Sequence, residues 1–174
     1  MNSDFKDLLR ILGECEVRYL VAGGYAVIHH SQPRYTKDID IWLEPTPENA
    51  CKLMQAFRLF GIPMVGVSQE DFATSGTQFS LGVPPCEIDF LTTIPGLEFA
   101  PAWNNKVISE EEDFPIHYLG KSDLIIAKKP PVAFSISQIS RKSDARARIE
   151  PGSGSKECPT AFLGIRTNAR YAVC

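Results

Sequence analysis

The spacing of apolar residues predicts two amphipathic helices in the first 61 residues of the chain. Ser3 is the expected N-cap of the first helix and Gly13 its expected end, while Thr46 and Gly61 have the same roles in the second. Because apolar residues every three or four positions form one helix face, each helix is expected to cover a sheet. The apolar positions are Phe5, Leu8, Leu9 and Leu12 in the first helix, and Ala50, Leu53, Met54, Phe57 and Phe60 in the second.

Short apolar or alternating runs predict strands at 19–22 and 36–43, and a hairpin of 77–81 with 86–90 across the loop at 82–85. A short helix is expected to start at Ser68 between these strands.

Downstream, the pattern predicts a helix at 97–104, short strands around 107–108 and 115–118, and a helix from Lys121 capped by Ser122. This mixture of strands and helices predicts one α/β (α+β) domain at residues 1–129.

Two glycines lie where the strand at 19–22 turns into the next predicted helix. Gly23 and Gly24 follow the apolar run directly, and Tyr25 to His30 can continue as a helix. The first turn of a helix has unpaired N–H groups, and glycine lets an anion approach them closely. His29 and His30 follow each other on this helix and diverge by about 100°, so they are expected to form a partly exposed polar face.

Asp38 and Asp40 form the clearest chemical signal in the chain. Side chains alternate between the faces of a strand, so these aspartates point to one side while Ile39 and Ile41 point to the core. Neighbouring carboxylates repel each other, and a cation between them relieves this repulsion. Carboxylate oxygens favour Mg²⁺ or Mn²⁺, so the pair predicts a divalent metal site.

The glycine pair, a short helix and the Asp38-x-Asp40 strand together resemble the nucleotidyltransferase superfamily, which includes DNA polymerase beta. The TKDIDIWL run is most similar to the small bacterial AbiE- and MenT-type nucleotidyltransferases of toxin–antitoxin systems. The resemblance covers roughly residues 5 to 129, and it implies a mixed sheet flanked by helices. It also implies a third carboxylate on a later strand, for which Asp89 is preferred over Glu87 because an apolar pair follows it.

The resemblance implies that Asp38, Asp40 and Asp89 are catalytic and hold the metal. It also implies a nucleotide site, with a lysine toward the phosphates that is either Lys128 or Lys129. Arg34 would either neutralise the triphosphate or lie in a solvated loop. The implied nucleotide-binding residues are Gly23, Gly24, Arg34, Thr36, Lys128 and Lys129.

The implied activity is metal-dependent transfer of an NMP from an NTP to a tRNA end or a protein hydroxyl. The protein would then be a bacterial toxin with a cognate antitoxin. A first alternative is a catalytically inactive protein of the same fold that acts as a binding or antitoxin-like partner. A second is an α/β domain in which Asp38 and Asp40 only cap and form ion pairs.

Composition limits the expected binding partners and the expected cellular location of the protein. The net charge of −3 gives no basic field for nucleic acid, although residues 1–129 hold 11 basic and 18 acidic residues. No apolar run approaches membrane-spanning length, and the polar start MNSDFKD is not a signal peptide. Five cysteines without a CxxC pair predict free thiols, and a cytoplasmic location is therefore expected.

The pattern stops after Lys129. Pro130 and Pro131 interrupt a helix, and residues 135–160 are rich in Ser, Arg, Gly and Pro without an apolar period. A flexible basic tail that contacts RNA is one interpretation, and a frameshift near codon 129 is the other and the preferred one. In either case residues 130–174 are expected to be a poorly ordered tail.

Overall fold

A computed structural model describes residues 1–31, 35–63, 66–83, 86–110 and 113–128. The predictions for Arg34, for Lys129 and for the tail at 130–174 therefore lie outside the described residues.

The described residues form a six-stranded mixed sheet with the strand order β3-β4-β2-β1-β6-β5. Strand β2 is antiparallel to β1 and parallel to β4, while the outer pairs β3–β4 and β5–β6 are antiparallel. The predicted α/β (α+β) class and mixed sheet are confirmed. The strands are β1 (Tyr19–Val21), β2 (Ile39–Leu43), β3 (Gln78–Val83), β4 (Cys86–Leu91), β5 (Val107–Ser109) and β6 (Ile116–Tyr118).

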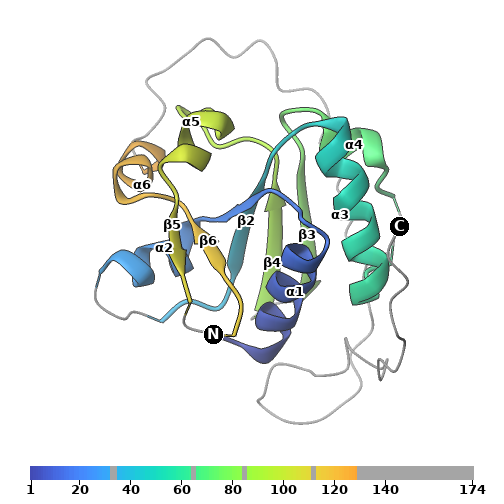
Figure 1. Cartoon of the computed structure of the whole chain (residues 1–174), viewed down its shortest axis with the longest axis horizontal. Helices are drawn as coiled ribbons and strands as arrows, with labels where there is room; N and C mark the ends of the chain where they lie inside the picture. The colour runs from blue at the N-terminus through green and yellow to red at the C-terminus, as the bar shows by residue number, and fades with distance from the viewer. Residues whose placement is uncertain (32–34, 64–65, 84–85, 111–112, 129–174) are drawn as a thin grey trace.

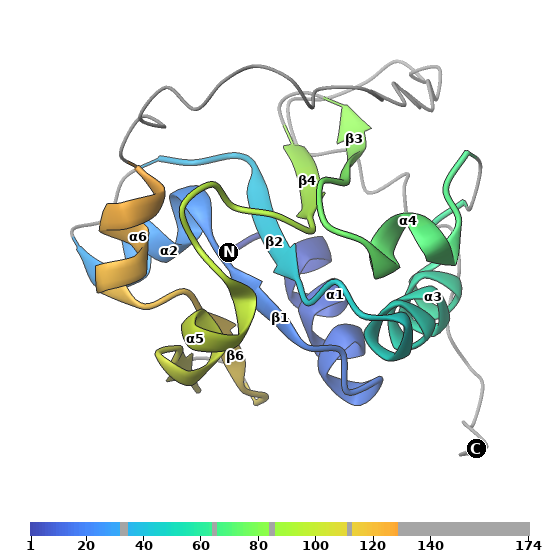
Figure 2. The ribbon, with the colours of Figure 1, turned by 90° about the horizontal axis from the view of Figure 1, so that it is seen from above.

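Helices flank this sheet, as Figures 1 and 2 show. Helices α1, α3 and α4 group together, whereas α5 and α6 lie apart from them (Figure 2). The helices are α1 (Ser3–Glu14), α2 (Gly23–His30), α3 (Pro47–Phe60), α4 (Gln69–Ala73), α5 (Phe99–Asn104) and α6 (Lys121–Ala127).

One face of the sheet, called the core face here, packs against α1, α3 and α4. Ile39, Ile41 and Phe90 on this face are fully buried, and the Phe57 ring of α3 contacts the Phe90 ring at 4.8 Å between centroids. The opposite face, called the open face, carries Asp40 and Asp89, which are only partly buried. The apolar period therefore leaves the polar strand positions on the face that is free for a site.

Local capping signals fix the helix ends, with three corrections. The prediction that Gly13 ends the first helix is wrong, because α1 continues to Glu14 and has Cys15 as its C-cap. Thr46 caps α3 by accepting the Asn49 N–H at 3.2 Å, and Gly61 ends that helix in the left-handed region at φ 85°. The prediction of Ser3 as a cap is wrong, because Asn2 accepts the Asp4 N–H. The prediction of Ser122 as a cap is wrong as well, because α6 begins at Lys121 with Gly120 as its N-cap, so Ser122 lies inside the helix.

Two further findings concern the setting of the chain. No helix in the described residues is long and apolar enough to cross a membrane. Cys15 and Cys51 are free thiols, as predicted.

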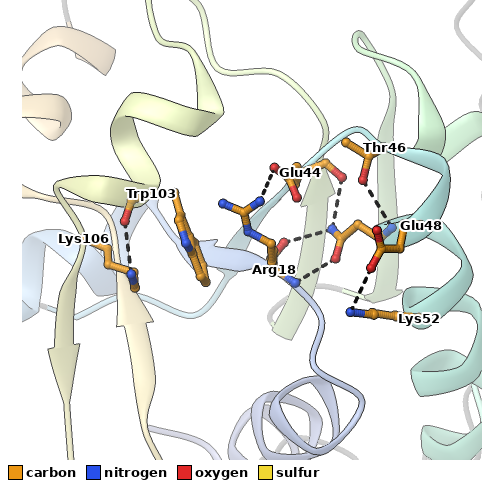
Figure 3. A network of polar contacts seen from close by, with 8 residues as sticks. Arg18, Glu44, Thr46, Glu48, Lys52, Trp103 and Lys106 are labelled. Atoms are coloured by element: carbon orange, nitrogen blue, oxygen red, sulfur yellow. Dashed lines mark hydrogen bonds and ion pairs between the residues drawn. The ribbon is translucent and has the colours of Figure 1, made fainter.

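A polar network around Asn49 joins the start of β1, the end of β2 and α3. Asn49 is buried, its Nδ2 donates to the backbone oxygens of Arg18 and Glu44, and its Oδ1 accepts the Arg18 N–H at 2.7 Å. The side chains of Arg18 and Glu44 form an ion pair at 2.6 Å (Figure 3). The Arg18 guanidinium also lies 4.8 Å from the centre of the Trp103 ring, which brings α5 into the network (Figure 3).

We expect Asn49→Ala to lower the free energy of unfolding by about 2–4 kcal/mol, because it leaves backbone groups of Arg18 and Glu44 without partners. Urea denaturation measures this change. The control is Glu48→Ala on the same helix, which removes only an exposed ion pair with Lys52 and should change stability by less than about 0.5 kcal/mol. Equal losses in the two variants would contradict a structural role for the buried amide.

Candidate functional site

The register of the central strands brings two of the predicted carboxylates together. Asp40 in β2 lies directly opposite Asp89 in the parallel strand β4. Residues in register share a face of the sheet, so both side chains are on the open face. Asp38 is exposed and lies just before β2, two residues from Asp40. Glu87 is on the same face as Asp89 but two residues farther from the position opposite Asp40.

Asp40 is the most constrained of these carboxylates. Burial raises its pKa, and the charges of Asp89 and Asp38 raise it further, whereas a hydrogen bond from the Gly24 N–H lowers it. When Asp40 is ionised, two negatively charged neighbours repel it. One backbone N–H from the first turn of α2 offsets only part of this repulsion.

Gly23 allows α2 to begin against the Asp40 carboxylate. A Cβ at position 23 would lie 1.8 Å from Asp40 Oδ2, and the φ of Gly23 is +52°. Both the contact and the backbone angle disfavour other residues, so glycine at this position lets α2 start against the Asp40 side chain.

Gly24 makes room for Thr36 in the same way. A Cβ at position 24 would lie 2.4 Å from Thr36 Oγ1, and that hydroxyl donates to the Asp38 backbone oxygen at 3.4 Å. The two glycines thus hold the segment that contains Asp38 against the start of α2.

Asp89 is held by a residue that sequence reasoning missed. Ser80 in β3 lies directly opposite Asp89, and its hydroxyl donates a hydrogen bond to Asp89 Oδ1. Within the described residues, no three His, Cys, Asp or Glu side chains are arranged to hold a metal ion. Asp40 and Asp89 share one face, and the charges of Asp89 and Asp38 act on Asp40, but the three carboxylates do not form a ready metal-binding group.

A pocket of about 450 Å³ opens beside Asp40. Asp40 and Gly23 contribute to its wall, and so does Lys128, which follows α6. The alternative Lys129 lies outside the described residues, so the choice between these lysines stays a prediction. The other lining residues are Ala22, Gly76, Thr77, Gln78, Leu91, Thr93, Ile94, Pro95, Leu119, Leu124 and Ala127.

His29 and His30 are engaged away from the carboxylates. His30 Nε2 lies 2.8 Å from the backbone oxygen of Leu119, and the His29 ring stacks on Tyr118 at 4.3 Å. Both histidines are partly exposed, which confirms the predicted polar face.

No family model and no curated protein sequence matches the chain. Among solved structures, the chain is similar to a candidate nucleotidyltransferase from Thermotoga maritima, at 16% sequence identity and a TM-score of 0.48. The alignment covers 70% of this chain and 78% of that one. A likeness at this level does not assign the chain to a family, and the narrower resemblance to AbiE- and MenT-type proteins stays a prediction.

We expect Gly23→Ala to lower the free energy of unfolding by about 2 kcal/mol or more, because the new methyl group would collide with Asp40 at a positive φ. Chemical denaturation followed by circular dichroism measures the loss. Gly13→Ala is the matched control, since no atom lies within 4 Å of a Cβ there. That control should stabilise α1 by up to about 1 kcal/mol. A similar effect at both glycines would mean that the contact with Asp40 is not limiting.

We expect Asp40→Asn to raise the melting temperature of the metal-free protein by a few degrees at pH 7. The raised pKa means that the stability contributed by Asp40 is present below the ordinary aspartate pKa and is lost as pH rises through the raised value. Asparagine removes the charge and keeps an acceptor for the Gly24 N–H.

Thermal unfolding in EDTA at several pH values tests this expectation. The advantage of Asp40→Asn should shrink as pH falls toward the ordinary aspartate pKa, because Asp40 then takes up a proton. The exposed Asp113→Asn is the control for the general effect of removing one negative charge. A variant less stable than the native protein at pH 7 would show that the Asp40 charge stabilises the metal-free fold.

Proposed function

We propose that this protein is a metal-dependent nucleotidyltransferase that moves an NMP from an NTP to a hydroxyl group of an RNA, such as a tRNA end, or of a protein. The observation that carries the proposal is that Asp40 and Asp89 lie in register on the open face. The start of α2, with its two glycines, and the pocket lie beside Asp40. In this reaction the acceptor oxygen attacks the α-phosphorus. The bond from that phosphorus to the bridging oxygen breaks, pyrophosphate leaves, and the hydroxyl proton is released.

The donor set fits Mg²⁺ or Mn²⁺. Carboxylate oxygens are the ligands that these ions prefer, and the mutual repulsion at Asp40 is what a divalent cation relieves. Asp38 and Asp40 would hold the ion, with Asp89 as the third carboxylate. When bound, the ion would stabilise negative charge that develops on the phosphates.

The residues of the pocket have complementary roles in this proposal. Gly23 and Gly24 let the start of α2 approach Asp40 and Thr36 closely, and the resemblance in sequence assigns both glycines and Thr36 to the nucleotide site. Lys128 contributes positive charge to the same pocket. Chain groups therefore orient the triphosphate while the carboxylates set the metal position.

The resemblance in sequence supports a finer proposal. The protein would be the toxin of a bacterial toxin–antitoxin pair, act in the cytoplasm and be neutralised by a cognate antitoxin. Both acceptors, a tRNA end and a protein hydroxyl, remain part of the proposal.

One observation favours a second function. Asp89 already accepts a hydrogen bond from Ser80, and the described carboxylates do not converge on a metal position. A catalytically inactive protein that keeps the fold as a binding or antitoxin-like partner would show this arrangement as well.

The test is incubation of the protein with each α-labelled NTP, Mg²⁺ and total tRNA, followed by separation of labelled RNA from labelled protein. We expect one acceptor to be labelled, and Asp38→Asn/Asp40→Asn to reduce labelling by at least about a hundredfold. Mg²⁺ should also raise the melting temperature of the native protein and hardly that of the double variant, because the ion binds only the assembled site.

The two readouts separate the candidates. Stabilisation by Mg²⁺ that depends on the aspartates, without transfer to RNA or protein, would support the inactive binding partner. Equal stabilisation of both proteins and no transfer would overturn the metal site.

A further inference from the structure

The strand register places Gln78 on the same face as the candidate carboxylates. Gln78 in β3 lies opposite Leu91 in β4, and Leu91 lies opposite Trp42, two residues beyond Asp40 in β2. Two strand spacings and two residues of rise separate the backbones of Asp40 and Gln78 by roughly 12 Å. Both residues line the pocket, so its wall extends from the carboxylates to Gln78.

The pocket wall is largely apolar beyond Asp40. Leu91 and Ile94 contribute from β4 and the segment after it, and Leu124 and Ala127 contribute from α6. Apolar surfaces from separate segments suit a flat aromatic ring, and the volume of about 450 Å³ falls within the usual range for small-molecule sites. A nucleobase has this shape and carries polar atoms only at its edges.

Gln78 is the one amide side chain among the described residues of the pocket wall. The Thr77 hydroxyl donates to the Asp71 backbone oxygen, and Thr93 Oγ1 accepts the Gly76 N–H at 2.8 Å. The exposed amide of Gln78 has no hydrogen-bond partner among the described residues. Its donor and acceptor are therefore free for a ligand.

We infer that Gln78 reads the edge of a nucleobase bound in the apolar part of the pocket and so determines which nucleotide the protein selects. This inference rests on the proposed function and adds its specificity. A glutamine amide pairs bidentately with a base edge that presents one donor beside one acceptor, and such a pair contributes strongly to discrimination between bases. The roughly 12 Å between Gln78 and Asp40 leaves room for the ribose between the base and the phosphates.

The experiment is calorimetric titration of the full chain with ATP, GTP, CTP and UTP in Mg²⁺ without an acceptor. The native protein should prefer one nucleotide. Gln78→Met, which keeps the side-chain length but removes both hydrogen-bonding groups, should weaken that preference by about tenfold. Gln78→Glu should shift the preference toward GTP, because guanine presents two adjacent donors to a carboxylate.

The matched control is Gln55→Ala. Gln55 is also an exposed glutamine, but it lies on α3, which packs against the core face. This control should leave the affinity ratios unchanged, and thermal unfolding of each variant verifies its fold.

The inference and the proposed function fail in different ways. Nucleotide binding with the same affinity ratios in the native protein and in both Gln78 variants would overturn the role of Gln78 and leave the nucleotidyltransferase proposal intact. A native protein that binds all four nucleotides equally would also overturn it. Absence of any nucleotide binding by the native protein would overturn the proposed function itself.

Discussion

The close approach of Gly23 to Asp40 is the constraint on which the candidate site depends. The Asp40 carboxylate occupies the space that any larger residue at position 23 would need, and it accepts the Gly24 N–H. The Ala22 N–H also donates to the Asp40 backbone oxygen at 2.9 Å, so the end of β1 and the middle of β2 are joined through both side chain and backbone. Because β2 lies between β1 and β4, this junction also fixes Asp40 relative to Asp89.

Local signals predicted most of the elements, since caps and periodicities depend on neighbouring residues. Thr46 and Gly61 bound α3 as expected, and the glycine pair opens α2. The predicted N-caps of α1 and α6 are wrong by one or two residues. At α1 the neighbouring Asn2 takes the place of Ser3 by accepting the Asp4 N–H, whereas at α6 tertiary contacts decide where the helix starts. At α6 the preceding Leu119 donates its N–H to Val21 and its carbonyl contacts His30, which places Gly120 at the cap.

The site was predictable only in part, for a related reason. The period of two predicts Asp38 and Asp40 on one side of a strand from 36, but β2 begins only at Ile39 and leaves Asp38 outside it. The residue opposite Asp40 depends on the register of β2 with β4. The same holds for Ser80 and Gln78, whose places follow from the β3–β4 register. A hairpin was predicted at these strands, so counting back from its loop is the one signal in the sequence that points to Ser80. Nothing in the local pattern marks Gln78.

Electrostatics connects the metal to the nucleotide in the proposed function. The open face gathers Asp40, Asp89 and Glu87, and residues 1–129 carry seven more acidic than basic side chains. Lys128 is the one basic side chain among the described residues that line the pocket. A triphosphate without a metal ion would be repelled by these carboxylates. A nucleotide that carries Mg²⁺ brings the positive charge that offsets the repulsion at Asp40. In the proposed function the ion and the nucleotide are therefore expected to bind as one unit, and the same carboxylates would disfavour phosphate compounds that arrive without the ion.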